Sequence, residues 1–101
     1  MNTNRLYSEV TQAIWGAEEL QRSGKDSRSK WLRVSALEDQ IAMKCSVSDA
    51  ERRIARRGAV SAALKAEDYK KAERFVEKYA TGISKRHYRE LQSILHEADK
   101  K

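Results

Sequence analysis

Apolar residues recur every three to four positions along most of this 101-residue chain, which is the spacing of an amphipathic α-helix. No stretch of any length alternates apolar and polar residues as a half-buried strand would. Proline is absent, and Gly24 and Gly82 follow two of the periodic segments, at positions where helices commonly end. The pattern predicts an all-α fold: a compact bundle of about five helices, forming a single domain over residues 1–101.

The periodic segments also give approximate bounds for the helices. We expect helices over residues 4–22, 30–44, 49–65, 69–80 and 85–98, with a polar connector at 23–29, a tight αα-hairpin between the third and fourth helices, and Ser84 as the cap of the fifth. The apolar stripes outside the third helix are expected to be Leu6, Val10, Ile14 (or Ala13), Ala17, Leu20, Trp31, Val34, Leu37, Ile41, Cys45, Tyr69, Ala72, Phe75, Val76, Tyr79, Tyr88, Leu91, Ile94, Leu95 and Ala98.

The segment Asp49–Lys65 differs from the others because it is apolar on two sides. A Ser-x-x-Glu capping box, formed by Ser48 and Glu51, predicts where it begins. A helix with two apolar sides contacts more than one neighbour, so we place this one at the centre of the bundle. Gly58 lies in its interior, and a close helix crossing would explain a residue that costs about 1 kcal/mol there relative to alanine. The two sides are Ala50, Ile54, Val60 and Leu64, and Ala55, Ala59, Ala62, Ala63 and Ala66.

Charge is the second feature that shapes the prediction. The chain has 21 Lys and Arg residues against 15 Asp and Glu, a net charge of +6, which favours acidic partners. Arg56 and Arg57 have no acidic residue three or four positions away, and other cations occupy the first turns of helices, where the helix dipole disfavours them. These positions predict a surface that binds nucleic acid or an acidic protein: Arg52, Arg53, Arg56, Arg57, Lys85, Arg86 and Arg89.

Two alternatives remain open for these cations. Acidic residues on other helices could compensate them, in which case the arginines are structural, and Arg57 could lie along the apolar face. A sharper functional hypothesis is a helix-turn-helix over residues 40–58, with Ala42 and Ser46 at the positions where that motif has small residues. The motif requires a buried, branched residue where this chain has Arg52, so only half of it is present.

The sequence offers no constellation for catalysis. It contains no nucleophile–base pair, glycine-rich phosphate loop or metal-ligand cluster, so we expect neither an enzyme nor a cofactor or metal. His87 and His96 are nine residues apart, too far to share a metal from one helix face, and both are expected at the surface. Cys45 is the single cysteine and is expected to be a small buried apolar residue.

These observations favour a non-enzymatic binding protein of the cytoplasm. No signal peptide and no apolar run long enough to span a membrane is visible. The leading hypothesis is a regulator that contacts nucleic-acid phosphates through its arginine-rich helix starts. The alternative is an adaptor, inhibitor or assembly subunit that occludes or bridges an acidic surface of a larger protein. The apolar content is low, so a partner or a second copy could complete the core.

Overall fold

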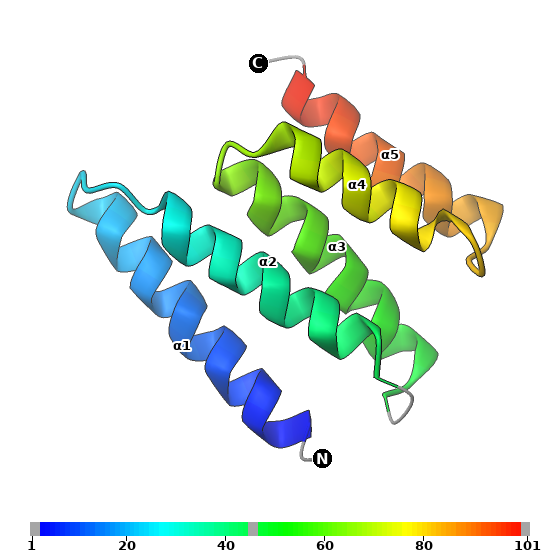
Figure 1. Cartoon of the computed structure of the whole chain (residues 1–101), viewed down its shortest axis with the longest axis horizontal. Helices are drawn as coiled ribbons and strands as arrows, with labels where there is room; N and C mark the ends of the chain where they lie inside the picture. The colour runs from blue at the N-terminus through cyan, green and yellow to red at the C-terminus, as the bar shows by residue number, and fades with distance from the viewer. Residues whose placement is uncertain (1–2, 45–46, 100–101) are drawn as a thin grey trace.

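The computed structural model describes residues 3–44 and 47–99 and forms five α-helices there (Figure 1). Their bounds match the predicted segments closely, although the second helix begins and ends two residues earlier than expected. The all-α fold predicted from the periodicity is confirmed. The helices are α1 (Thr3–Arg22), α2 (Arg28–Ala42), α3 (Asp49–Lys65), α4 (Tyr69–Ala80) and α5 (Lys85–Asp99).

Each helix runs antiparallel to the one before it (Figure 1). α1, α2 and α3 pack in their order along the chain, and α4 and α5 both pack on α3 and on each other. The resulting molecule is flat, with extents of 39 × 37 × 16 Å. α3 packs against α2, α4 and α5, and so has more neighbouring helices than any other, which confirms its predicted central position. α1 forms one edge of the array and packs along α2. None of the helices in the described ranges is both long and apolar enough to cross a membrane.

The helix starts follow the predicted capping chemistry. At the start of α3, Ser48 Oγ accepts a hydrogen bond from the Glu51 backbone N–H at 3.2 Å, and Glu51 Oε1 accepts one from the Ser48 N–H at 3.3 Å. This is the reciprocal capping box. At the start of α5, Ser84 Oγ accepts from the His87 N–H at 3.1 Å. Both starts are therefore set by residues next to them in the chain.

The helix ends depend on left-handed backbone. Gly24 and Gly82 have φ values of +71° and +85°, which glycine adopts without strain, and they end α1 and α4 as predicted. Glu67 adopts a φ of +62° after α3, where a non-glycine residue is strained. The N–H of Asp68 donates to the carbonyl of Ala63 at 3.0 Å, so this turn is a Schellman motif with glutamate at the usual glycine position.

The core is built from small residues along α3 and larger ones on its neighbours. All five alanines of the predicted small-residue side are buried, and this lets the flanking helices approach closely. Phe75 and Tyr79 of α4 stack with ring centroids 5.9 Å apart. The buried members of the predicted stripes are Leu6, Val10, Ala13, Ala17, Trp31, Val34, Leu37, Ile41, Val60, Ala72, Phe75, Val76, Tyr79 and Leu91.

Four predicted orientations are wrong. Ile54 is 65 % exposed and Ala50 is exposed, because the remaining side of α3 faces solvent between its neighbours. Tyr69, the first residue of α4, is 39 % exposed. His87 is buried, with 2 % of its surface exposed, because α5 turns it toward α3. The predictions for Cys45 and for the side chain of Ala98 lie outside the described part of the chain.

The arrangement of α2 and α3 differs from that of a helix-turn-helix. The two helices lie antiparallel along their lengths, as an αα-hairpin does, whereas the DNA-binding motif requires a steep crossing (Figure 1). Gly58 also differs from its expected role, since its close neighbour is the side chain of Glu38 and not the backbone of another helix. A helix-turn-helix therefore does not account for the arginines of α3, and their roles depend on the contacts of each side chain.

Candidate anion-binding site

The N-terminal half of α3 and the turn between α4 and α5 enclose a hollow of about 210 Å³. Three of the seven predicted cations meet there, together with the buried His87. α5 also begins at this turn, and the N–H groups that precede His87 in its first turn have no partner within the helix, whereas the His87 N–H donates to Ser84. The residues lining the hollow are Asp49, Arg52, Arg53, Arg56, Gly82, Ile83, Ser84 and His87.

Arg52 is committed to holding the connection between α2 and α3. Its Nη2 donates to the carbonyl oxygens of Lys44 at 2.7 Å and Val47 at 3.4 Å, and its Nη1 lies 3.3 Å from a carboxylate oxygen of Asp49. The side chain is 24 % exposed. Arg52 thereby gives hydrogen bonds to two backbone carbonyls that lie between the helices, so its role is structural.

Arg53 is compensated by an acid that sequence spacing does not reveal. Its guanidinium lies 3.3 Å from Glu90 on α5, 37 residues away. Glu90 also lies 2.9 Å from His87 Nδ1, and hydrogen bonds from His87 and Arg53, together with the charge of Arg57, lower the pKa of this carboxyl from its ordinary value. Glu90 therefore offsets much of the positive charge on this side of α3.

Arg56 has no carboxylate partner within the described residues. Its guanidinium lies over the ring of Tyr79, 5.9 Å from the centroid, a geometry in which the ring face attracts a cation. Burial, and then the charge of Arg52, lower the pKa of Arg56 from its ordinary value. Tyr79 is held in place because its hydroxyl donates to Asp39 at 2.6 Å, and Lys78 pairs with the same carboxylate at 2.8 Å. Arg56 is thus a partly desolvated cation, positioned by an aromatic ring and open to an anion.

His87 is a residue of this hollow that was not predicted from the sequence. Its side chain is buried, Nδ1 faces Glu90, and Nε2 has no hydrogen-bond partner among the described residues. A buried polar nitrogen without a partner is uncommon in a folded protein. Its position four residues before the fully buried Leu91 places it on the inward side of α5 and is the signal that could have identified it.

The other four predicted cations lie outside the hollow. Arg57 on α3 and Lys85, Arg86 and Arg89 on α5 are exposed. In the structure of residues 3–44 and 47–99, none of these four side chains forms a hydrogen bond or an ion pair with the rest of the chain. Their charges are available to a partner, and the structure separates them from Arg52 and Arg53.

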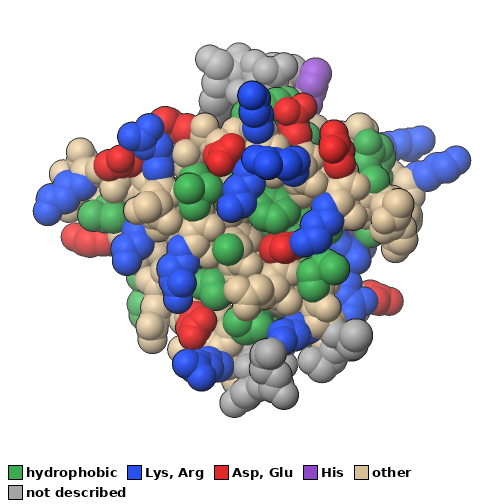
Figure 2. All heavy atoms as spheres, viewed as in Figure 1, with side chains coloured by type: hydrophobic (Ala, Val, Ile, Leu, Met, Phe, Trp, Pro, Cys, Tyr) green, Lys and Arg blue, Asp and Glu red, His purple; other side chains and the backbone are tan. Residues whose placement is uncertain are grey.

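On the face that is toward the viewer in Figure 1, the described side chains of positive and negative charge are mixed (Figure 2). Figure 2 shows Lys and Arg side chains interspersed there with Asp, Glu and apolar residues. Some of these charges pair across helices, as Lys78 of α4 does with Asp39 of α2. The described part of this face therefore carries no broad basic patch (Figure 2), and the candidate site is local.

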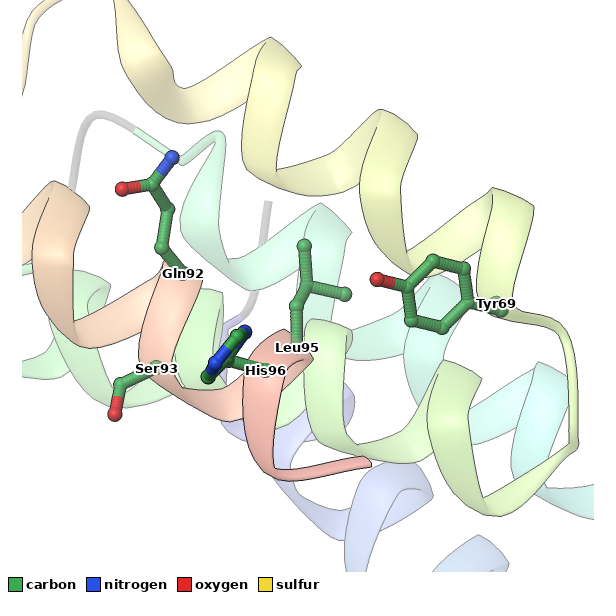
Figure 3. A pocket seen from close by; sticks show the side chains of 5 residues that line it. All are labelled: Tyr69, Gln92, Ser93, Leu95 and His96. Atoms are coloured by element: carbon green, nitrogen blue, oxygen red, sulfur yellow. The ribbon is translucent and has the colours of Figure 1, made fainter. Parts of the chain in front are cut away.

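Another hollow, of about 460 Å³, lies between α5 and the start of α4. Gln92, Ser93, Leu95 and His96 line it from α5, and Tyr69 lies across from them (Figure 3). His96 is exposed there, as predicted. None of the described Cys, His, Asp and Glu side chains gathers in threes to hold a metal ion, at this hollow or elsewhere. The described residues that line this hollow include no Lys or Arg that would recognise an anion.

Comparison with known proteins adds no family assignment. No protein-family model matches the chain, and no characterised protein or solved structure resembles it significantly.

Proposed function

We propose that this protein binds nucleic acid through its phosphate groups, using Arg56, Arg57, Lys85, Arg86 and Arg89. The observation that carries the proposal is the hollow at the start of α5, where Arg56 has no carboxylate partner in the described chain. A helix start and an arginine together favour a phosphate, because N–H groups and a guanidinium both donate to its oxygens. Arg52 and Arg53 fall outside the proposed contact set, since each is paired within the protein.

Contacts of this kind bind phosphates without reading the bases. Affinity then comes mainly from counterion release, and it falls steeply as salt concentration rises. The net charge of +6 adds long-range attraction to any polyanion. We therefore expect weak sequence preference.

The test measures binding to labelled single-stranded DNA, duplex DNA and RNA by fluorescence anisotropy over a range of salt concentrations. The double variant Arg56→Ala with Arg57→Ala should reduce the slope of log K against log salt by about two contacts' worth, roughly 1.8 for duplex DNA. The matched control is Lys25→Ala with Lys70→Ala, which removes the same charge from exposed residues of the α1–α2 connection and the start of α4. Absence of binding at low salt, or an equal loss of slope in both double variants, would contradict the proposal.

An acidic protein surface is the second candidate partner for the same cations. It is favoured by two large apolar side chains at the surface, Trp15 at 66 % exposure and Ile54 at 65 %. Exposed aromatic and aliphatic side chains are typical anchors of protein interfaces, and these two lie away from the arginine-lined hollow. Affinity purification from the native host, with and without nuclease, separates the two candidates. A partner retained after nuclease treatment favours protein, and one lost with the nucleic acid favours phosphate binding.

A further inference from the structure

A second, smaller hollow of about 120 Å³ opens on a different side of α3, between α1, α2 and α3. It is lined by Tyr7 of α1, by Glu38 of α2, and by Glu51, Ile54 and Ala55 of α3. Most of its wall is therefore apolar, and its charged groups are two carboxylates. It shares no residue with the arginine-lined hollow.

Glu38 occupies space that only a glycine on α3 leaves free. A Cβ atom built at Gly58 would lie 1.8 Å from Glu38 Oε2 and 2.7 Å from its Cδ, far inside van der Waals contact. The carboxylate thus packs directly on the backbone of α3. A glycine inside a helix costs about 1 kcal/mol relative to alanine. The chain therefore carries a destabilising residue at the point that admits this carboxylate.

The carboxylate of Glu38 gains no partner from this placement. Within residues 3–44 and 47–99, it receives no hydrogen bond and forms no ion pair. The neighbouring Tyr7 does not donate a hydrogen bond to Glu38, because its hydroxyl donates to Glu51 instead. Burial raises the pKa of Glu38 to about 7, with no compensating cation. An acid buried without a partner weakens the fold, and such departures from local rules are expected at functional sites.

The chemistry of the hollow defines what would fill it. The apolar wall, including the exposed Ile54, suits an alkyl chain, and the unpaired carboxylate suits a cation at the end of that chain. Lysine combines a four-carbon stem with a compact ammonium, whereas the planar guanidinium of arginine is broader. A hollow of about 120 Å³ holds roughly four waters, which favours the compact group.

We propose that this hollow is a docking site for a lysine side chain of a protein partner, with its stem against Ile54 and Tyr7 and its ammonium on Glu38. Charge complementarity identifies this occupant. The hollow opens to solvent, and its Glu38 carboxylate has no cationic partner among the described residues, so a cation from outside would complete it. The site is independent of phosphate binding and lies on another side of α3. It gives the protein a second binding surface, of opposite charge to the first.

The test uses n-butylammonium as a probe of the lysine side chain, with the full chain and NMR detection. A ligand of five heavy atoms binds weakly, with Kd roughly 1 to 100 mM. We expect a saturable shift of the Ile54 methyl and Tyr7 ring signals and a fall of about one unit in the pKa of Glu38, because a nearby cation favours the ionised form. Neutral n-butanol should leave that pKa unchanged.

Two variants make the proposal falsifiable. Glu38→Gln keeps the shape and removes the charge, so it should abolish the saturable shift, whereas Glu77→Gln at an exposed position of α4 should leave it intact. Gly58→Ala should displace the carboxylate from the hollow, return the pKa of Glu38 toward its usual value and also abolish binding. Equal shifts in the chain with Glu38→Gln and the unsubstituted chain, or no saturable shift at all, would overturn the site.

The source of the lysine is tested by sedimentation of the protein over a range of concentrations. A monomer at every concentration supports a separate partner protein. Self-association that Glu38→Gln abolishes and Glu77→Gln preserves would overturn the separate partner and assign the lysine to a second copy of this chain. The double variant Arg56→Ala with Arg57→Ala should bind n-butylammonium normally, so failure of phosphate binding leaves this result unaffected.

Discussion

Arg53 on α3 and Glu90 on α5 form an ion pair of 3.3 Å across 37 residues of sequence. The pair joins the central helix to the last one at the edge of the arginine-lined hollow. Hydrogen bonds from His87 and Arg53, both of which line the hollow, lower the pKa of the Glu90 carboxyl, so this acid offsets positive charge there. Glu90 is thus an internal competitor for any phosphate.

Removing this competitor should strengthen nucleic-acid binding. Glu90→Gln releases Arg53 and adds one net positive charge, so the affinity for single-stranded DNA at low salt should rise roughly two- to five-fold. Fluorescence anisotropy measures the change. Glu97→Gln removes one exposed acid from the same helix and is the control, with a smaller expected effect. Equal increases in affinity in the two variants would contradict a specific role of Glu90 and assign the effect to net charge alone.

Arg52→Ala should reduce stability more than binding. The guanidinium satisfies two carbonyls in the connection between α2 and α3, and these would lose a charged donor. We expect the free energy of unfolding to fall by about 1 to 2 kcal/mol, measured by urea denaturation followed by circular dichroism. Arg57→Ala, at an exposed position without a partner in the described chain, should change it by less than about 0.5 kcal/mol. Similar losses in both variants would contradict the structural role of Arg52.

Glu67→Gly should stabilise the protein. Glu67 has a φ of +62°, which strains a residue with a Cβ and suits glycine. The gain in the free energy of unfolding should be about 1 kcal/mol. Glu67→Ala provides the comparison, because both variants remove the exposed 3.8 Å contact with Arg28 and only glycine relieves the strain. A gain of equal size with alanine would assign the effect to charge.

Glu38→Gln should stabilise the protein at alkaline pH and leave it unchanged in acid. Burial raises the pKa of Glu38 to about 7 from an ordinary value of 4.5, so the folded state favours the protonated form. The penalty is absent below about pH 4.5, grows as pH rises toward 7, and is complete above that value. The full shift corresponds to about 3 kcal/mol, and solvent screening of this partly exposed side chain reduces it to roughly 1 to 2 kcal/mol.

Urea denaturation at pH 4 and pH 8 measures this difference. The groups around Glu38 do not obscure it. The hydrogen bond to Glu51 raises the pKa of Tyr7 to about 12, and burial raises that of Tyr79 well above its usual range, so both tyrosines stay neutral. The hydrogen bond from Tyr7 lowers the pKa of Glu51, which stays ionised over most of this range. Glu77→Gln is the control, and an equal stability change at both pH values for Glu38→Gln would contradict the burial of its charge.

The helices and their ends were predictable because local signals specify them. Periodicity gave the bounds of all five helices, Ser48 and Glu51 gave the start of α3, and Gly24 and Gly82 gave two helix ends. The alanine side of α3 was predicted as a packing surface and is buried. Each of these features depends on residues within a few positions of one another, where helical geometry fixes which side chains meet.

The candidate site was predicted only in part. Sequence spacing correctly showed that Arg56 and Arg57 lack a local acid, but it could not show that Glu90 compensates Arg53 or that Arg52 binds the carbonyls of the preceding turn. His87 was expected at the surface, and its nine-residue separation from His96, which excluded a shared metal, says nothing about its distance from α3.

Five helices, a small-residue central helix and an excess of positive charge can thus all be read from the order of the residues. Which cations remain unpaired depends on how α3 and α5 are rotated against each other, and this follows only from their packing. The packing of α2 on α3 likewise places Glu38 on Gly58, two residues 20 positions apart on antiparallel helices. Helical periodicity fixes the direction of a side chain on its own helix, whereas the group that it meets is fixed by the packing of the whole array.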